Sequence, residues 1–511
     1  MPIVRSRRQI AQTASISAPV GGLNARDSIA NMPPQDAVVL DNLFPSPSNV
    51  SLRNGKQSWA TGLPAAVNTL ASFSQASGSR KLFAASGGKI FDVTLSGTVG
   101  AAAVSGLSSD WWQFINFGAA GGQYLVMVNG LDGPQIFNGT AWQTITNSST
   151  PIAITGVNPA NFVHVQEFMG RLFFVEANSM RAWYLPLGSV GGAAQQLDFS
   201  SFTRLGGYLM AMMTWTIDNS SGMQQIAAFI TSEGEVLLYQ GNDPSYASSW
   251  YSIGGFRIGR PVGRRCFVKI GADVGVLTAD GLFPLSKALL TDRSQRQDAI
   301  SDKITNLINS DVQAYAANQG WQAILHPIGN KLIVNVPNTS GTYQYVMNTI
   351  HGAWCRFTGW SANCWELMGD SLFYGGQGVV YWADTGNADD GAAINAVAVQ
   401  APNYFGTRQQ KQFTMGRPVL SSNAAIRPAF QINADFSVAP PSSLSSFSSG
   451  AFTYLPAPWG SLWSSSAQIY KDWQGVSTIG FSGSPAMAFS VKNASVTWQS
   501  TDVTFINGDP L

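Results

Sequence analysis

The sequence predicts an all-β protein built around a β-propeller with six or seven blades, and three observations support this fold class. A hairpin-like pattern recurs through the middle of the chain, its copies are spaced at a length typical of one blade, and helical periodicity is rare. Each copy combines an apolar run, a turn that contains Gly or Asn, and a second run that ends in an aromatic residue. This combination is typical of a β-hairpin.

The pattern occurs seven times. The first runs of the seven hairpins are 82–85, 124–128, 172–175, 226–230, 274–277, 332–336 and 372–374. The second runs are 90–91, 136–137, 183–184, 236–239, 282–283, 343–345 and 379–382. Successive copies begin on average about 48 residues apart, and periods of roughly 40 to 50 residues are typical of propeller blades.

A hairpin alone cannot bury both of its faces, so each blade needs further strands. Apolar stretches at 111–114, 162–165 and 266–268 precede three of the hairpins and are candidates for these strands. We therefore expect three or four strands in each blade. An irregular series of β-sandwiches is the alternative, because the repeat has no fixed signature dipeptide.

The regions that flank the repeats predict two further parts. We expect an extended N-terminal arm over 1–60 with a short helix at 36–40, a propeller body over 61–400, and a C-terminal β-sandwich-like module over 401–511. One helix is expected as an insertion between blades near 298–312, because apolar residues recur there at helical spacing and Asp298 stands near its start.

The composition excludes several classes of protein. The chain of 511 residues has 29 Lys and Arg against 28 Asp and Glu, a formal net charge of +1, so a protein that coats nucleic acid nonspecifically is disfavoured. Three His and three Cys argue against a metal site with several such ligands and against a disulfide scaffold. No window resembles a membrane span or a cleaved signal peptide, and we expect neither.

No catalytic signature is apparent. His164, His326 and His351 do not adjoin a recognisable nucleophile, and His164 lies in an alternating apolar run that predicts a buried core or interface position. Cys355 and Cys364 are expected to be buried, reduced thiols. We predict no catalytic, cofactor-binding or metal-binding residues and no enzymatic activity. A glycosidase remains open as a minority interpretation, because its paired carboxylates leave no linear signature.

Two charged segments each leave two interpretations open. The loop 384–391 has the oxygen ligands that calcium requires but lacks the order of an EF-hand, so a solvated turn is the default. The basic cluster either faces phosphate or an acidic partner or forms a solvated loop balanced by nearby carboxylates. Its members are Arg257, Arg260, Arg264, Arg265 and Lys269, followed later by Arg293 and Arg296.

Ten short segments carry structural motifs, namely 21–27, 32–37, 40–45, 52–55, 301–304, 320–322, 335–337, 345–348, 353–357 and 384–386. These segments resemble those of tail nozzle proteins, also called tail tubular protein B, of short-tailed bacteriophages. A related tail hub or DNA-stabilisation protein has a similar design.

The resemblance implies a structural virion protein in the phage tail, assembled in the host cytoplasm. Members of the family form a homohexameric tube below the head-to-tail adaptor and close the DNA exit before infection, with a propeller in each subunit. Tail fibres or spikes and genomic double-stranded DNA, bound without sequence specificity, are the other expected partners. The low net charge suits this role, because phosphate contacts would hinder sliding. A propeller that binds glycans or a receptor, or degrades polysaccharide, is the alternative function.

Overall fold

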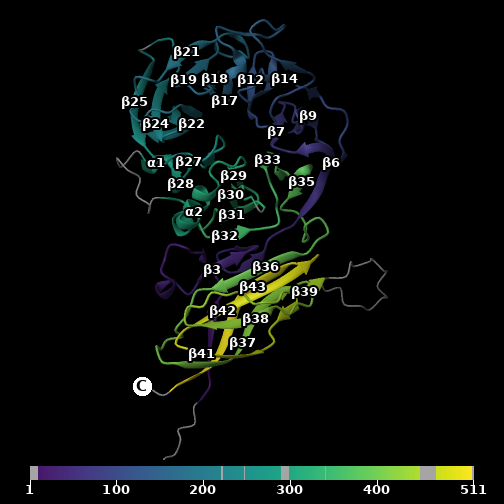
Figure 1. Ribbon diagram of the computed structural model, residues 1–511, viewed down its shortest axis with the longest axis vertical. Coiled ribbons are helices and arrows are strands. Elements are labelled where there is room, and N and C mark those ends of the chain that lie inside the picture. The colour runs from purple at the N-terminus through teal and green to yellow at the C-terminus, as the bar shows by residue number, and fades with distance from the viewer. Residues whose placement is uncertain are drawn as a thin grey trace, which may run out of the picture. The chain divides into compact units, whose positions relative to one another are not determined.

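The computed structural model describes residues 10–219, 222–246, 248–288, 299–339, 341–448 and 468–508 (Figure 1). The chain divides into two compact units. We call Ser58–Thr342 with Ser361–Ala383 the propeller unit. We call Met1–Gln57, Tyr343–Trp360 and Asp384–Leu511 the sandwich unit. In the described part of the chain, no helix has the length and hydropathy that a membrane span needs.

Seven groups of β-strands make up most of the described propeller unit: six are whole sheets and one is a hairpin that belongs to a larger sheet. The first four sheets are β7 (Thr69–Ser74), β8 (Arg80–Ala85), β9 (Lys89–Asp92) and β11 (Val104–Ser105); β12 (Gln113–Ala119), β13 (Gly122–Val128), β14 (Gln135–Phe137) and β15 (Trp142–Thr144); β17 (Phe162–Phe168), β18 (Arg171–Glu176), β19 (Arg181–Tyr184) and β21 (Gln195–Asp198); and β22 (Leu209–Asn219), β23 (Gly222–Thr231), β24 (Glu235–Gly241) and β25 (Trp250–Arg257). The last three are β26 (Phe267–Ile270), β27 (Asp273–Thr278) and β28 (Gly281–Pro284); the hairpin β29 (Gln322–His326) and β30 (Lys331–Val336); and β33 (Cys364–Met368), β34 (Ser371–Gly375) and β35 (Gln377–Ala383), joined by β6 (Lys56–Ala66) and β10 (Gly97–Thr98).

These sheets form a closed ring of seven blades, in which the first strand of each blade lies at the centre (Figure 1). Each sheet contacts the next, and β33 of the last sheet contacts β7 of the first. The last sheet also contains β6, so strands from the beginning and the end of the propeller segment share one blade. This arrangement confirms the predicted β-propeller and gives seven blades.

The predicted hairpins account for the middle of the blades. Six of the seven are antiparallel pairs, namely β8–β9, β13–β14, β18–β19, β23–β24, β27–β28 and β34–β35. The two runs of the remaining hairpin are the strands β30 and β31 (Tyr343–Asn348), of which β31 belongs to the sandwich unit. Buried aromatic and aliphatic side chains such as Phe117, Phe162 and Phe174 fill the space between neighbouring blades and supply the packing energy of the ring.

The predicted helical insertion is present between the fifth and sixth blades. A 3₁₀ turn at Asp302–Ile304 leads into the helix α2 (Thr305–Tyr315), which buries Ile308 and Val312 and contacts β28. The regular helix therefore begins later than the predicted range 298–312, and Asp298 lies outside the described residues.

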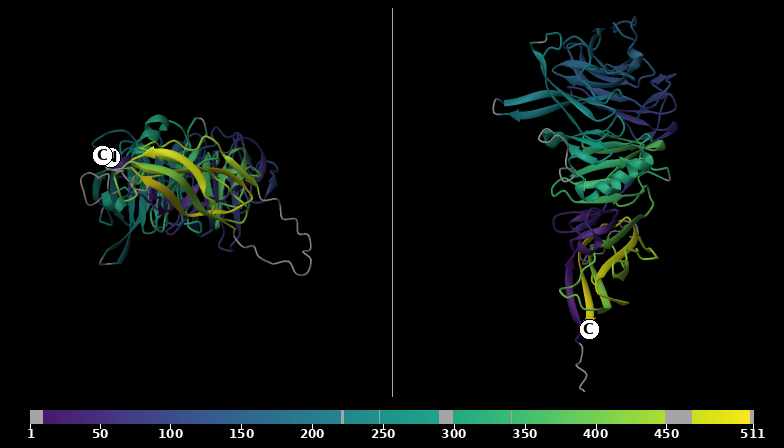
Figure 2. Two further views of the ribbon diagram at one scale, coloured as in Figure 1. Left: turned by 90° about the horizontal axis from the view of Figure 1, so that it is seen from below. Right: turned by 60° about the vertical axis from the view of Figure 1, so that its left-hand side comes forward.

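The sandwich unit contains two sheets that pack face to face through Phe413, Ile432, Val503 and Phe505 (Figures 1 and 2). One sheet is formed by β1 (Gln12–Ser17), β4 (Leu43–Pro45), β5 (Val50–Leu52), β37 (Lys411–Ser422), β40 (Gln468–Tyr470), β41 (Gln474–Gly480) and β43 (Val496–Asn507). The other contains β2 (Gly22–Leu23), β3 (Asp36–Asp41), β31, β32 (Trp354–Phe357), β36 (Ile394–Gln400), β38 (Ala429–Ala434), β39 (Ser445–Ser448) and β42 (Gly483–Lys492).

The strands of the N-terminal segment belong to both sheets of the sandwich unit. Strand β1 pairs with β43 and β3 pairs with β36, so the contacts group the chain differently from the predicted ranges 1–60, 61–400 and 401–511. The predicted short helix at 36–40 is wrong, because these residues form β3. Val38 and Val39 are β-branched and favour a strand, and Ala37 and Leu40 are buried in the sheet.

Candidate functional site

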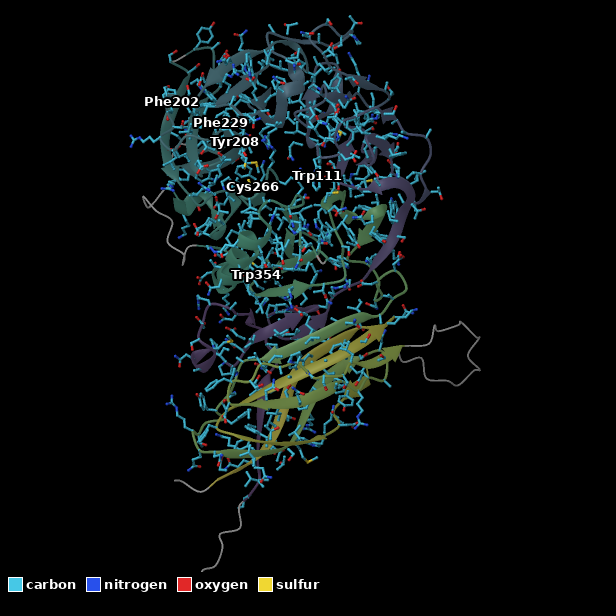
Figure 3. The ribbon with its side chains drawn as sticks, viewed as in Figure 1. Trp111, Phe202, Tyr208, Phe229, Cys266 and Trp354 are labelled. Carbon is cyan, nitrogen blue, oxygen red and sulfur yellow. The ribbon has the colours of Figure 1, made fainter. Side chains whose placement is uncertain are left out.

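The innermost strands of the blades enclose a cavity of about 220 Å³ at the centre of the propeller. A wider funnel of about 670 Å³ adjoins it and shares Gln113, Arg264 and Arg265 with it. Figure 3 labels Trp111 and Tyr208, which line the funnel. The cavity is lined from all seven blades by Leu70, Gln113, Phe114, His164, Val165, Gln166, Met213, Arg264, Arg265, Phe267, Gln322, Ala323, Trp365 and Glu366.

Arg265 bridges three blades. It precedes β26, and its guanidinium donates hydrogen bonds to the carbonyl of Asn68 at 3.2 Å, the hydroxyl of Thr69 at 2.7 Å and the carbonyl of Trp112 at 3.0 Å. The guanidinium carbon also lies 5.4 Å from the ring centroid of Trp111. The hydrogen bonds and the aromatic ring compensate part of the cost of removing this charge from water.

Arg264 is less fully bonded. Its Nη1 donates to the carbonyl of Met210 at 2.9 Å, and its guanidinium carbon lies 6.0 Å from the ring centroid of Tyr208. Burial lowers the pKa of both Arg264 and Arg265. Among the described residues, neither guanidinium forms an ion pair with a carboxylate.

Glu366 supplies the carboxyl group of the cavity. It lies on β33, and the hydroxyl of Ser72 on β7 donates to its Oε1 at 2.6 Å. Burial raises the pKa of Glu366 to about 7, although the Ser72 hydrogen bond and the charge of Arg265 act in the opposite direction. Glu366 therefore changes its charge near neutral pH.

His164 lies on β17, the innermost strand of its blade, and is neutral. The backbone N–H of Met212 donates to its Nδ1 at 3.5 Å, which requires that this nitrogen carry no proton. Burial, together with the charge of Arg264, lowers the pKa of His164 to about 3. The predicted buried position is confirmed, since the residue is only 7% exposed.

The other histidines and the cysteines have no evident catalytic arrangement. The Nε2 atoms of His326 and His351 lie 3.2 Å from backbone carbonyls. All three cysteines are buried free thiols, as predicted for Cys355 and Cys364. Burial raises the pKa of Cys266 to about 12 and of Cys364 to about 11, so both remain protonated and weakly nucleophilic.

The basic cluster is distributed over different environments. Arg264 and Arg265 line the cavity, whereas Arg260 lies at the funnel and forms an ion pair with Glu233 at 2.6 Å. Arg257 and Lys269 are exposed on β25 and β26. The predicted members Arg293 and Arg296 lie outside the described residues.

A second set of polar side chains is buried in the sandwich unit. Arg53 donates to both carboxylate oxygens of Asp389, at 2.8 and 2.5 Å, and also to the side-chain oxygen of Asn42 and the carbonyl of Thr358. Its guanidinium carbon lies 4.8 Å from the ring centroid of Trp360. Asp389 belongs to the loop 384–391 that was considered for calcium, and both of its carboxylate oxygens bind an arginine instead.

Further bonds in this unit tie the N-terminal segment to later strands. Arg356 donates to both oxygens of Asp41, at 2.7 and 2.6 Å, and this contact raises the pKa of Arg356. Asn24 donates to Asp36 at 2.7 Å, and Asn348 donates to the carbonyl of Pro45 at 3.0 Å. Within the described ranges, no three His, Cys, Asp or Glu side chains are grouped as a metal site would require.

No protein-family model matches the sequence, and no curated protein is similar to it. Among solved structures, BBS1N in complex with ARL6DN, soaked with mercury, has 9% sequence identity and a TM-score of 0.37, with 65% of this chain and 96% of that chain covered. YCF48 from Cyanidioschyzon merolae has 11% identity and a TM-score of 0.37, with 64% of this chain and 98% of that chain covered. Similarity at this level carries no inference about function.

Proposed function

We propose that the chain is a structural protein of the tail of a short-tailed bacteriophage virion, the tail nozzle. In this proposal six copies form a tube below the head-to-tail adaptor, which conducts the genomic DNA, closes its exit and carries tail fibres or spikes. One observation carries the proposal. Segments that resemble the family supply the buried polar contacts of the sandwich unit, including Asn24–Asp36, Asn42–Arg53 and Asp41–Arg356.

The use of these residues favours a structural role. Most of the resembling segments before residue 60 and between 343 and 360 contribute to bonds that join strands distant in sequence. They do not line the cavity of the propeller. Of the other resembling segments, 320–322 does reach the cavity, through Gln322. In the sandwich unit the resemblance therefore lies in residues that determine how the subunit is built.

The dimensions of the cavity require a DNA path outside the propeller. Its volume of about 220 Å³ is that of a site for a small group and not of a channel for a polymer. A DNA duplex, whose major groove alone is about 12 Å wide, cannot enter it. A conduit must then lie between subunits, which is consistent with a ring of several copies and not with a monomeric channel.

The cavity also gives little support to the alternative of polysaccharide hydrolysis. Glycosidases generally need two carboxyl groups that face each other across the bond. Among the described lining residues of the cavity, Glu366 is the single carboxylic acid, and Glu233 of the funnel is bound to Arg260. We therefore propose no enzymatic activity.

Electron microscopy of the purified chain, alone and mixed with capsids that carry the adaptor, tests the proposed function. We expect six-fold rings with an axial channel wide enough for a duplex, attached at the portal vertex. Mass photometry of the same sample should give a species of six copies. Particles that remain monomeric and never attach to the portal vertex would contradict the proposal.

A further inference from the structure

We propose that the central cavity of the propeller, with its funnel, is a binding site for a compact molecule that carries a carboxylate or phosphate group. This inference does not depend on the proposed function, because it concerns one subunit and not its assembly.

The charge balance of the cavity is the first argument. Arg264 and Arg265 both line it, and neither has an ion pair among the described residues. By contrast, the buried Arg53 of the sandwich unit is neutralised by Asp389. The one carboxyl group among the described lining residues of the cavity, Glu366, interacts with Arg265, so two guanidinium groups share a single carboxyl. A cation removed from water with too little counter-charge is costly. An oxyanion bound by Arg264 would supply the missing counter-charge.

Unused hydrogen-bond donors are the second argument. A guanidinium has five N–H donors, and the described acceptor of Arg264 is the carbonyl of Met210. Arg264 lines both the cavity and the funnel, so its remaining donors lie where a ligand would enter. Gln113 also lines both spaces, and its side chain has no hydrogen-bond partner among the described residues. Two parallel donors of an arginine fit the oxygens of a carboxylate or phosphate.

The size and walls of the site fit a small ligand. The cavity of about 220 Å³ accommodates the anionic group, and the funnel of about 670 Å³ is within the range of small-molecule sites. Trp111 and Tyr208 provide aromatic walls beside the two arginines. Figure 3 labels both rings.

Glu366 makes the expected binding depend on pH. The groups around its carboxyl are the Ser72 hydroxyl on β7, the Arg265 guanidinium before β26, and the Cys364 thiol on its own strand, while neutral His164 on β17 lines the same cavity. The pKa of Glu366 is about 7. Above that pH its negative charge repels an anion, and below it the neutral carboxyl does not, so binding should tighten as pH falls.

Calorimetric titration of the full chain with sodium phosphate and with sodium malonate, each compared with sodium chloride at equal ionic strength, tests the site. We expect saturable binding of at least one probe, and the preferred probe then identifies phosphate or carboxylate as the ligand class. Arg264→Met should weaken binding at least tenfold, whereas Arg257→Met, at an exposed position outside the cavity, should leave it unchanged. Binding no stronger than that of chloride, or equal binding by Arg264→Met, would overturn the proposal.

A gain of binding removes the possibility that a variant fails merely because it misfolds. At pH 8, Glu366→Gln lacks the repelling charge and should bind the preferred probe about tenfold more tightly than the parent chain, an increase typical of one nearby charge. At pH 6 the two proteins should bind equally. An unchanged affinity at pH 8 would show that the anion does not occupy this cavity.

Discussion

The ion pairs of the sandwich unit and the arginines that line the propeller cavity differ in how their charge is balanced. In the sandwich unit, Arg53, Arg356 and Arg417 each face a carboxylate at 2.5 to 2.6 Å. In the cavity of the propeller unit, Arg264 and Arg265 have no ion pair among the described residues. Their guanidinium groups donate to carbonyls and a hydroxyl and lie beside aromatic rings. The ion pairs thus fix structure in the sandwich unit, while the arginines and Glu366 of the propeller cavity remain able to respond to a ligand or to pH.

The difference follows from how each unit holds its strands together. The sandwich unit joins segments that are far apart in the sequence, and its ion pairs link Arg53 to Asp389 and Asp41 to Arg356. The propeller is held by apolar packing between successive blades and by β6 in the last blade. The arginines that line the propeller cavity help to hold the ring of blades closed, but they do not determine which strands pair.

The largest expected effect comes from breaking a pair in the sandwich unit. Arg53→Met leaves Asp389 without its counter-charge and should lower the free energy of unfolding of this unit by about 3–5 kcal/mol, as is typical when one partner of a buried pair is removed. Hydrogen exchange of the amides of β3 and β36, together with urea unfolding, measures the loss.

Lys81→Met is the matched control, because Lys81 and Asp92 form an exposed ion pair. Its expected cost is below about 1 kcal/mol. A loss in Arg53→Met no larger than in this control would mean that the buried pair does not stabilise the sandwich unit.

A smaller loss of stability is expected when an arginine of the propeller cavity is replaced by methionine. Arg265→Met removes hydrogen bonds to Asn68, Thr69 and Trp112 but breaks no direct ion pair among the described residues. We expect a loss of about 2–3 kcal/mol, the scale of hydrogen bonds to a charged group. Faster hydrogen exchange in β7 and β12 would show it, with Arg257→Met as an exposed control. A loss equal to that of Arg53→Met would remove the contrast between the units.

The fold could be predicted where its signal is local. The apolar run, turn and second run of each hairpin lie within about twenty residues, so their periodicity is visible in the sequence. The strand pairing of the sandwich unit has no such local signal, because β1 and β43 pair although they lie at opposite ends of the chain. The short segment 36–40 was predicted as a helix, but its pairing with the distant strand β36 makes it a strand.

The candidate site could be predicted only in part. The arginines near residue 260 were conspicuous in a chain with few charges, but their direction depends on which strand is innermost in its blade. Glu366 had no signal of its own, since a single acid beside Trp365 is indistinguishable from a surface position. Its carboxyl reaches the cavity because β33 lies beside β7, a contact between residues about 290 positions apart.

His164 should make the propeller sensitive to acid. The unfolded chain binds a proton near pH 6.5, whereas the folded chain does so only near pH 3, so folding becomes less favourable as pH falls below 6.5. Between pH 6.5 and pH 5 this costs about 2 kcal/mol. The difference in unfolding free energy between His164→Gln and the parent chain should therefore shift in favour of the variant by that amount. His351→Gln, at an exposed position, should show no such shift, and a parallel pH dependence in both variants would contradict a neutral buried His164.

Glu366 should act in the opposite direction and more weakly. Its pKa is raised to about 7 in the folded chain, so between pH 4.5 and 7 the folded state holds a proton that the unfolded state has released, and stability falls as pH rises. A fully desolvated carboxyl would lose about 3 kcal/mol over this range, and solvent in the cavity reduces the expected loss to about 1–2 kcal/mol. Glu366→Gln should remove it, while Glu233→Gln at the funnel should not. If the stability of Glu366→Gln followed the same pH dependence as the parent chain, the carboxyl of Glu366 would be fully solvated. The propeller cavity would then lack the titrating charge that distinguishes it from the paired arginines of the sandwich unit.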